Sequence, residues 1–349
     1  MKEINTKYSM VQYFIEREKE IKPGLAFNGS TKDDFQKWHN KLKNKLIELL
    51  GEFPKQVPLN PKVIARADCG DHWREKIVID TEEHFSVPAW LLLPKDLKPN
   101  EKRPVLLGLH GHRDGGKDHP AGVSISYSDR LAGISKPSVG QELVKEGYIV
   151  FCPDSRGFGE LSEGEEGNPY PGKDKCDAHF IRGLILGINL ITLNIWDLIK
   201  SIDYLETRPE VASDRIGSFG LSWGGTRSTY ISAIDDRIKA TVVSGYSTTT
   251  KHYAIDTANF CGSQFVPQMY CYADVGDIIG LSAPKPLLLQ TGIDEECFSV
   301  ESGIKCHEHV KKIYSAAGEP AKVRTDLFCG GHQYDIPEII KFFKEYLLI

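Results

Sequence analysis

The segment Gly220-Leu221-Ser222-Trp223-Gly224 constrains the fold more than any other stretch of this chain. It follows an apolar, β-rich run at 215–220 and precedes a helix-like run at 223–234. A strand that turns at once into a helix makes a sharp elbow, and flanking glycines keep neighbouring Cβ atoms out of its way. Taken by themselves, these five residues could also form a glycine-rich turn in which the serine has no catalytic role. The strand before and the helix after instead favour Ser222 raised above the edge of a sheet, at a helix N-terminus.

Short β-rich runs alternate with helix-like segments over most of the chain. The runs are 76–80, 87–93, 104–110, 148–154, 215–220, 239–245, 286–292 and 323–328. The helix-like segments are 138–146, 184–206, 223–234, 299–317 and 336–348. The first two runs predict an antiparallel pair, and the continuous apolar runs in the middle are typical of parallel strands covered on both faces. The sequence therefore predicts an α/β fold with a mostly parallel eight-stranded sheet and helices on both faces.

The first sixty residues read as helical. One apolar stripe, at spacings of three and four, contains Phe35, Trp38, Leu42, Leu46, Leu49 and Leu50, and the helix should stop at Gly51 and Pro54. We expect residues 1–60 to form a helical extension packed on a catalytic domain at 61–349. The connections 155–183 and 246–283 are too long for simple crossovers, so we expect them to build the binding pocket or its lid.

Composition excludes several classes of function. A formal net charge of −5 and a pI near 6.1 give no electrostatic basis for binding nucleic acid or an anionic membrane. No stretch approaches eighteen consecutive apolar residues, so no membrane span is predicted. The charged N-terminus lacks the features of a signal peptide, which favours a cytoplasmic protein. Eight scattered cysteines without a Cys-x-x-Cys pair are expected to be free thiols, mostly buried, and the oligomeric state cannot be read.

Partners for a nucleophilic serine follow in the chain order Ser, Asp, His. Asp294 comes after the run 286–292, and His332 comes after the last run, 323–328. His332 would take the proton of Ser222 and return it to the leaving group, while Asp294 would fix the tautomer of the imidazole. Glu295 and Glu296 are adjacent rivals for the acid, and Asp294 is preferred because it comes first after the strand and turn.

The stretch His110-Gly111-His112 allows two readings. Two imidazoles two residues apart, with Asp114 close behind, could begin a zinc site. A tight turn after a strand could instead offer the N–H of His112, together with that of Trp223, to an oxyanion. The oxyanion reading is preferred, because a binuclear zinc hydrolase would show a His-x-His-x-Asp-His run and residue 115 is glycine. Cys306, His307 and His309 would not all face one ion on a helix, so no metal and no cofactor is predicted.

From roughly residue 60 to the end, the chain resembles α/β-hydrolases of the dienelactone hydrolase and acetyl xylan esterase type. The matching stretches are 110–112, 154–160, 208–225, 283–296 and 330–332. The resemblance implies an α/β-hydrolase fold and an esterase with Ser222, Asp294 and His332 as its triad. The first sixty residues lie outside it. The chain differs from the pattern of these families in two respects. Dienelactone hydrolases carry a cysteine nucleophile, and acetyl xylan esterases typically have Gln where this chain has Phe158 and Trp223. The resemblance therefore implies the general chemistry more than the substrate.

We therefore expect a serine carboxylic-ester hydrolase that works through an acyl-enzyme, on short acyl esters and by resemblance on those of carbohydrates. One alternative is a serine peptidase of the prolyl-oligopeptidase type, although sixty helical residues cannot supply the propeller of such enzymes. Another is a binding protein with a hydrolase fold and no turnover. Arg156 is expected to hold neighbouring groups in place, whereas His179 and Arg182 could line the pocket.

Overall fold

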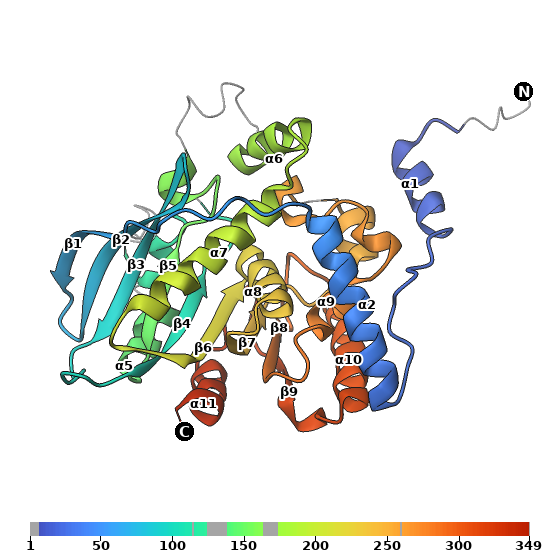
Figure 1. Ribbon diagram of the computed structural model, residues 1–349. Coiled ribbons are helices and arrows are strands. Elements are labelled where there is room, and N and C mark those ends of the chain that lie inside the picture. Colours follow the sequence, from blue (N-terminus) through green and yellow to red (C-terminus); the bar gives the residue numbers. More distant parts are fainter. Residues whose placement is uncertain (1–6, 114, 124–137, 163–173, 259, 349) are drawn as a thin grey trace, which may run out of the picture.

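The computed structural model describes residues 7–113, 115–123, 138–162, 174–258 and 260–348. Its centre is a nine-stranded sheet in the order β1-β2-β3-β5-β4-β6-β7-β8-β9 (Figure 1). The strands are β1 (Lys62–Asp68), β2 (His72–Glu82), β3 (Phe85–Pro94), β4 (Arg103–Leu109), β5 (Ile149–Pro153), β6 (Val211–Leu221), β7 (Ile238–Ser244), β8 (Leu287–Gly292) and β9 (Val323–Phe328).

Strand direction divides the sheet into two parts. Strands β1, β2, β3 and β5 pair antiparallel in that order, whereas all pairs from β5 through β4, β6, β7 and β8 to β9 are parallel. The carboxyl ends of the parallel strands therefore meet at one edge. In open α/β sheets this is the edge at which ligands bind.

All eight predicted strands are confirmed. The sheet has a ninth strand, β1, so the predicted number of eight is corrected to nine. β1 spans Lys62–Asp68 at the antiparallel end of the sheet, and all seven of its residues are exposed. A strand with no buried face carries no apolar alternation, which explains why the sequence pattern did not show it.

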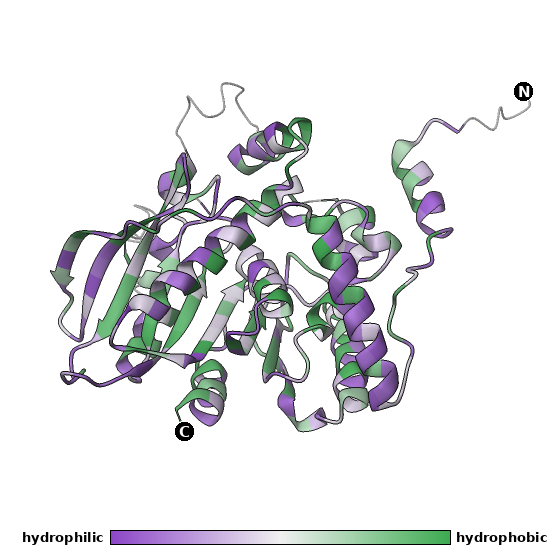
Figure 2. Cartoon of the chain, viewed as in Figure 1, coloured by the Kyte–Doolittle hydropathy of each residue, from purple (hydrophilic) through white to green (hydrophobic). Residues whose placement is uncertain are grey.

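Helices cover both faces of the sheet. The described helices are α1 (Met10–Glu18), α2 (Lys32–Leu50), α3 (Asp118–Ala121), α5 (Val139–Lys145), α6 (Lys175–Ile185), α7 (Leu190–Thr207), α8 (Trp223–Ile234), α9 (Val275–Gly280), α10 (Val300–Ala317) and α11 (Ile336–Leu347), and most of them cover the sheet. Apolar side chains of α2, α7, α8, α9 and α10 form one core with the sheet, and those of α3, α5 and α11 form a second core. Strands β3 to β8 contribute to both cores, because successive side chains point to opposite faces of the sheet. In β4, Val105 and Leu107 belong to the first core and Leu106 to the second. Figure 2 shows hydrophobic residues along the central strands.

The N-terminal segment contains two different helices. α2 buries Phe35, Trp38, Leu42, Leu46 and Leu50. Thr31 and Asp34 form a capping box at its start, and Gly51, with φ +80°, ends it. The carbonyl of its last residue also accepts a hydrogen bond, since Thr192 Oγ1 at the start of α7 donates to Leu50 O at 2.6 Å. α1 has no buried residue and lies at the side of the molecule (Figure 1).

No single helix in the described ranges is long and apolar enough to cross a membrane. α6 and α7 pass the length and composition test only as a pair, and they are bent by 101° at their junction.

Candidate active site

Ser222 is the single residue between β6 and α8, and its backbone conformation is unusual. Its φ of +60° and ψ of −120° are sparsely populated for a residue with a side chain, which marks local strain. Glycine is required on both sides: a Cβ on Gly220 would lie 2.1 Å from Gly224 O, and one on Gly224 would lie 1.9 Å from Leu109 O. The predicted strand-to-helix elbow is therefore present, with Ser222 as the residue that precedes α8.

His332, in the loop after β9, contacts a carboxylate, but not the expected one. Its Nδ1 lies 2.8 Å from Glu295 Oε1 and 3.0 Å from Glu295 Oε2. The preference for Asp294 is therefore corrected in favour of Glu295. Glu296, the other rival, is exposed.

The backbone explains why the second acid after β8, and not the first, reaches His332. The N–H of Asp294 donates to Gly330 O at 2.9 Å, which ties the two loops together and leaves the Asp294 residue exposed. The Glu295 side chain is 1% exposed and also accepts a hydrogen bond from Cys297 N at 2.9 Å. Burial favours the protonated acid, but the hydrogen bond and charge of His332 lower the pKa of the Glu295 carboxyl below its ordinary value overall.

His110 has a structural role. Its Nδ1 lies 2.8 Å from Gly111 O, and its Nε2 accepts a hydrogen bond from Ser155 N at 3.0 Å. Because Nε2 accepts a hydrogen bond, it carries no proton and the imidazole is neutral. Burial first, and the nearby Arg227 guanidinium second, hold the pKa of His110 well below its usual value. This histidine cannot bind a metal while those bonds persist, which disfavours a zinc site shared with His112. Asp114, the third residue of that reading, lies outside the described residues.

The turn at 110–112 packs against the elbow, where the second oxyanion donor is expected. A Cβ on Gly111 would lie 3.7 Å from Ser222 Cβ, so the turn and the serine are close. Trp223 is the first residue of α8, so its N–H has no acceptor within the helix. Its indole points inward and donates to Ser155 Oγ at 2.9 Å, so only its backbone can face a substrate.

A cavity of about 620 Å³ lies at this edge of the sheet. Ser222, His332, Gly111 and His112 line it together. No hydrogen bond joins Ser222 Oγ to His332 among the described residues, and such bonds often tighten only when substrate binds. The other lining residues are His110, Arg113, His119, Pro120, Ser138, Val139, Asp174, Leu221, Phe260, Cys261, Gln264, Cys297, Gln333, Tyr334 and Ile336. They include Asp174 from the long connection 155–183 and Phe260, Cys261 and Gln264 from 246–283, part of the first connection lying outside the described residues.

The structural interpretation of Arg156 is confirmed. Its Nε and Nη2 each donate to the Asp197 carboxylate at 2.8 Å, and Nη2 also contacts Glu82. Arg156 therefore joins the loop after β5 to α7 and β2. His179 and Arg182, on α6, do not line it.

Sequence reasoning missed a pair of cysteines, Cys176 and Cys261, of which Cys261 lines the cavity. All eight cysteines are free, and four are buried, including Cys176 on α6 and Cys261 just before the short η3 helix (Gly262–Gln264). The contact with Cys176, and then that with His112, lowers the pKa of the Cys261 thiol below its ordinary value. The two cysteines lie 85 residues apart, so no spacing pattern could have linked them.

The model of the Abhydrolase family matches residues 4–329. The chain belongs to this family. The match begins at residue 4, so it includes nearly all of the first sixty residues. A Bacillus subtilis (strain 168) protein named as a hydrolase, YtaP, is 27% identical over 294 residues, which cover 83% of this chain and 92% of that protein.

A second curated relative shares a shorter stretch. Dipeptidyl-peptidase 5 of Porphyromonas gingivalis is 24% identical over 166 residues, which cover 47% of this chain but only 19% of that protein.

Solved structures support the same α/β-hydrolase fold. A Bacteroides fragilis protein described as an acetyl xylan esterase superposes with a TM-score of 0.76 and 22% identity, covering 93% of this chain and 83% of that one. A glucuronoyl esterase from Solibacter usitatus superposes with a TM-score of 0.61 and 16% identity, covering 94% and 99%. At these identities the likeness establishes the fold.

Proposed function

We propose that this α/β-hydrolase is a serine carboxylic-ester hydrolase in which Ser222 is the nucleophile, His332 the general base and Glu295 the acid that orients it. One observation carries the proposal: a histidine held by a buried carboxylate lines the same cavity as a serine on a strained strand-to-helix elbow. This is the arrangement that nucleophilic acyl transfer requires.

The proposed reaction has two halves. Ser222 Oγ attacks the ester carbonyl while His332 takes its proton, and the negative oxygen accepts hydrogen bonds from the N–H groups of His112 and Trp223. His332 then gives the proton to the departing alcohol, leaving an acyl group on Ser222. Water attacks that acyl group with His332 again as base, which releases the acid and restores the serine hydroxyl. Glu295 stabilises the imidazolium in both halves.

The proposed substrates are short acyl esters carried on carbohydrate. The cavity volume suits a small molecule, and its wall combines aromatic Phe260 and Tyr334 with polar Gln264, His119 and Asp174, groups that can bind sugar hydroxyls. The names of the structural neighbours, an acetyl xylan esterase and a glucuronoyl esterase, support this class.

The direct test is hydrolysis of p-nitrophenyl acetate by wild type and by Ser222→Ala. We expect the variant to lose at least about 10³-fold in kcat, because the nucleophile is removed. Circular dichroism should show an intact fold. Undiminished turnover in a folded variant would refute the proposal.

A peptidase and a binding protein remain the competing functions, and the short match to dipeptidyl-peptidase 5 favours the first over the second. Acetylated sugars, methyl esters of sugar acids and amide substrates assayed side by side would separate esterase from peptidase. We expect turnover of the esters only. Failure of a fluorophosphonate probe to label Ser222 would instead favour a binding protein.

A further inference from the structure

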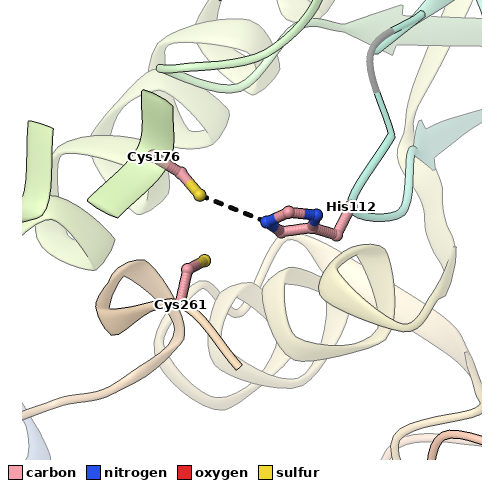
Figure 3. A group of neighbouring side chains, drawn as sticks. All are labelled: His112, Cys176 and Cys261. Atoms are coloured by element: carbon pink, nitrogen blue, oxygen red, sulfur yellow. Dashed lines mark hydrogen bonds between the residues drawn. The ribbon is translucent and has the colours of Figure 1, made fainter. Parts of the chain in front are cut away.

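Three potential metal ligands, His112, Cys176 and Cys261, point toward one another (Figure 3), and two of them, His112 and Cys261, line the cavity. His112 comes from the turn after β4, Cys176 from the first turn of α6, and Cys261 from the loop before η3. The Nε2 atom of His112 lies 3.1 Å from Cys176 Sγ, and a ring nitrogen of His112 and both sulfur atoms all lie within 4.8 Å of one another. Cys176 and Cys261 are 1% and 5% exposed.

The fold holds these three segments together without a metal. Asp177 Oδ1 on α6 accepts a hydrogen bond from Gly262 N at 2.7 Å, which fixes the residue after Cys176 against the residue after Cys261. Phe158 packs edge-on against the imidazole of His112 with the ring centroids 5.0 Å apart. Each ligand residue, or its immediate neighbour, is therefore anchored by a contact of its own, so the cluster is positioned by the surrounding structure.

The ligand set and its spacing match a particular kind of metal. Two thiolates and one imidazole suit Zn²⁺ and its spectroscopic substitute Co²⁺. With metal–ligand bonds of about 2.0–2.3 Å, tetrahedral ligands lie roughly 3.5–3.8 Å apart, so the three atoms need shifts of only about 1 Å or less. The His112 side chain is one-third exposed, and His112, Cys261 and Asp174 line the cavity. A fourth position therefore faces the cavity, where Asp174 Oδ2 lies 3.7 Å from His112 Nε2.

We propose that His112, Cys176 and Cys261 form a zinc site, with a fourth position filled by water or by the Asp174 carboxylate. Each thiol that still holds its proton releases it to solvent when the metal binds. The bound ion ties α6 and the loop before η3 to the turn after β4, beside the cavity. This site does not depend on the proposed esterase activity.

A disulfide between Cys176 and Cys261 is the competing use of the two thiols. It would make no use of the imidazole, although His112 Nε2 lies within contact distance of Cys176 Sγ. The histidine therefore favours a metal, and a test on fully reduced protein separates the two.

The experiment titrates the reduced full-length chain with Co²⁺ under anaerobic conditions and follows the thiolate-to-cobalt charge-transfer band. We expect one equivalent to bind, with a band that disappears in Cys176→Ser and in Cys261→Ser. His112→Ala should weaken binding by about 10- to 100-fold or more. Cys297→Ser is the matched control, since Cys297 belongs to a second cluster with Glu295 and His332 at the same cavity, and it should keep the band.

Measurements on wild type alone guard against variants that fail to fold. X-ray absorption of the one-to-one zinc complex should show two sulfur ligands at about 2.3 Å and nitrogen or oxygen ligands at about 2.0–2.2 Å. Excess zinc should also raise Tm, because the ion binds the folded state. A shell of nitrogen and oxygen only, a band lost in Cys297→Ser but kept in Cys176→Ser, or no binding by the reduced protein would each overturn the proposal.

Discussion

Asp294 and Glu295 are neighbours in the chain, yet the backbone sends their side chains into different surroundings. The N–H of Asp294 closes a bond to Gly330 O, while the carboxylate of Glu295 turns inward to His332 and Cys297 N. Sequence order located Ser222 and His332, because each follows a strand whose pattern is plain. It could not choose among three consecutive acids, because the choice depends on how one loop bonds to another.

Replacing the two acids separately tests the corrected assignment. Glu295→Gln removes the charge that stabilises the imidazolium of His332, so we expect kcat for p-nitrophenyl acetate to fall by about 10²- to 10⁴-fold. Asp294→Asn, which changes an exposed side chain, should stay within about threefold of wild type. The reverse ranking of the two variants would restore Asp294 as the acid.

Element boundaries were predictable wherever an element buries one face. Strands β4 to β9 and helices α8, α10 and α11 lie within a few residues of the segments expected from apolar runs and spacing. β1 was not predicted, because it has no buried residue. α6 was not predicted, because it lies within a glycine-rich and acidic connection and buries only Cys176. The spacing of apolar residues reflects which side chains are buried, so an element without a buried face has no clear apolar pattern in the sequence.

The apolar stripe of α2 offers a test of how far this helix belongs to the core. Leu46 is 0% exposed, whereas Ile47, the next residue of the same helix, is 41% exposed. Leu46→Ala should lower the free energy of unfolding by about 2–5 kcal/mol through lost burial and a cavity. Ile47→Ala is the matched control and should cost less than about 1 kcal/mol. Chemical denaturation measures both, and equal effects would mean that α2 does not pack as described.

At the scale of the whole molecule, the cavity is assembled from segments that only the complete fold brings together. The turn after β4, the elbow after β6, the loops after β8 and β9, and parts of both long connections all contribute to its wall. The sequence indicated the edge of the sheet at which this happens, because carboxyl ends of parallel strands meet there. The pairing of Cys176 with Cys261 and His112 depends on long-range packing, for which a single sequence carries no local signal.

Acid stability of the whole fold should depend on His307, which is buried on α10 beside Thr291. Burial lowers the pKa of His307 to about 4, against about 6.5 in an unfolded chain. Between these values the unfolded state binds more protons, so stability is full above pH 6.5 and is lost as the pH falls toward 4. The loss from this one group should be roughly 1–3 kcal/mol.

The comparison uses His307→Gln and, as a control, His84→Gln at an exposed position. The difference in unfolding free energy between wild type and His307→Gln should shrink from pH 7 to pH 4.5. The same difference for His84→Gln should stay nearly constant. A constant difference for His307→Gln would show that this imidazole does not carry the dependence.

The most direct measurement of the central claim is the site of covalent modification. Intact-mass and peptide analysis after reaction with a fluorophosphonate should find one adduct per chain, on the peptide that contains Ser222. Labelling should vanish in Ser222→Ala and slow by orders of magnitude in His332→Ala, because the serine is activated only through that imidazole. An adduct on another residue, or full-speed labelling without His332, would contradict the account.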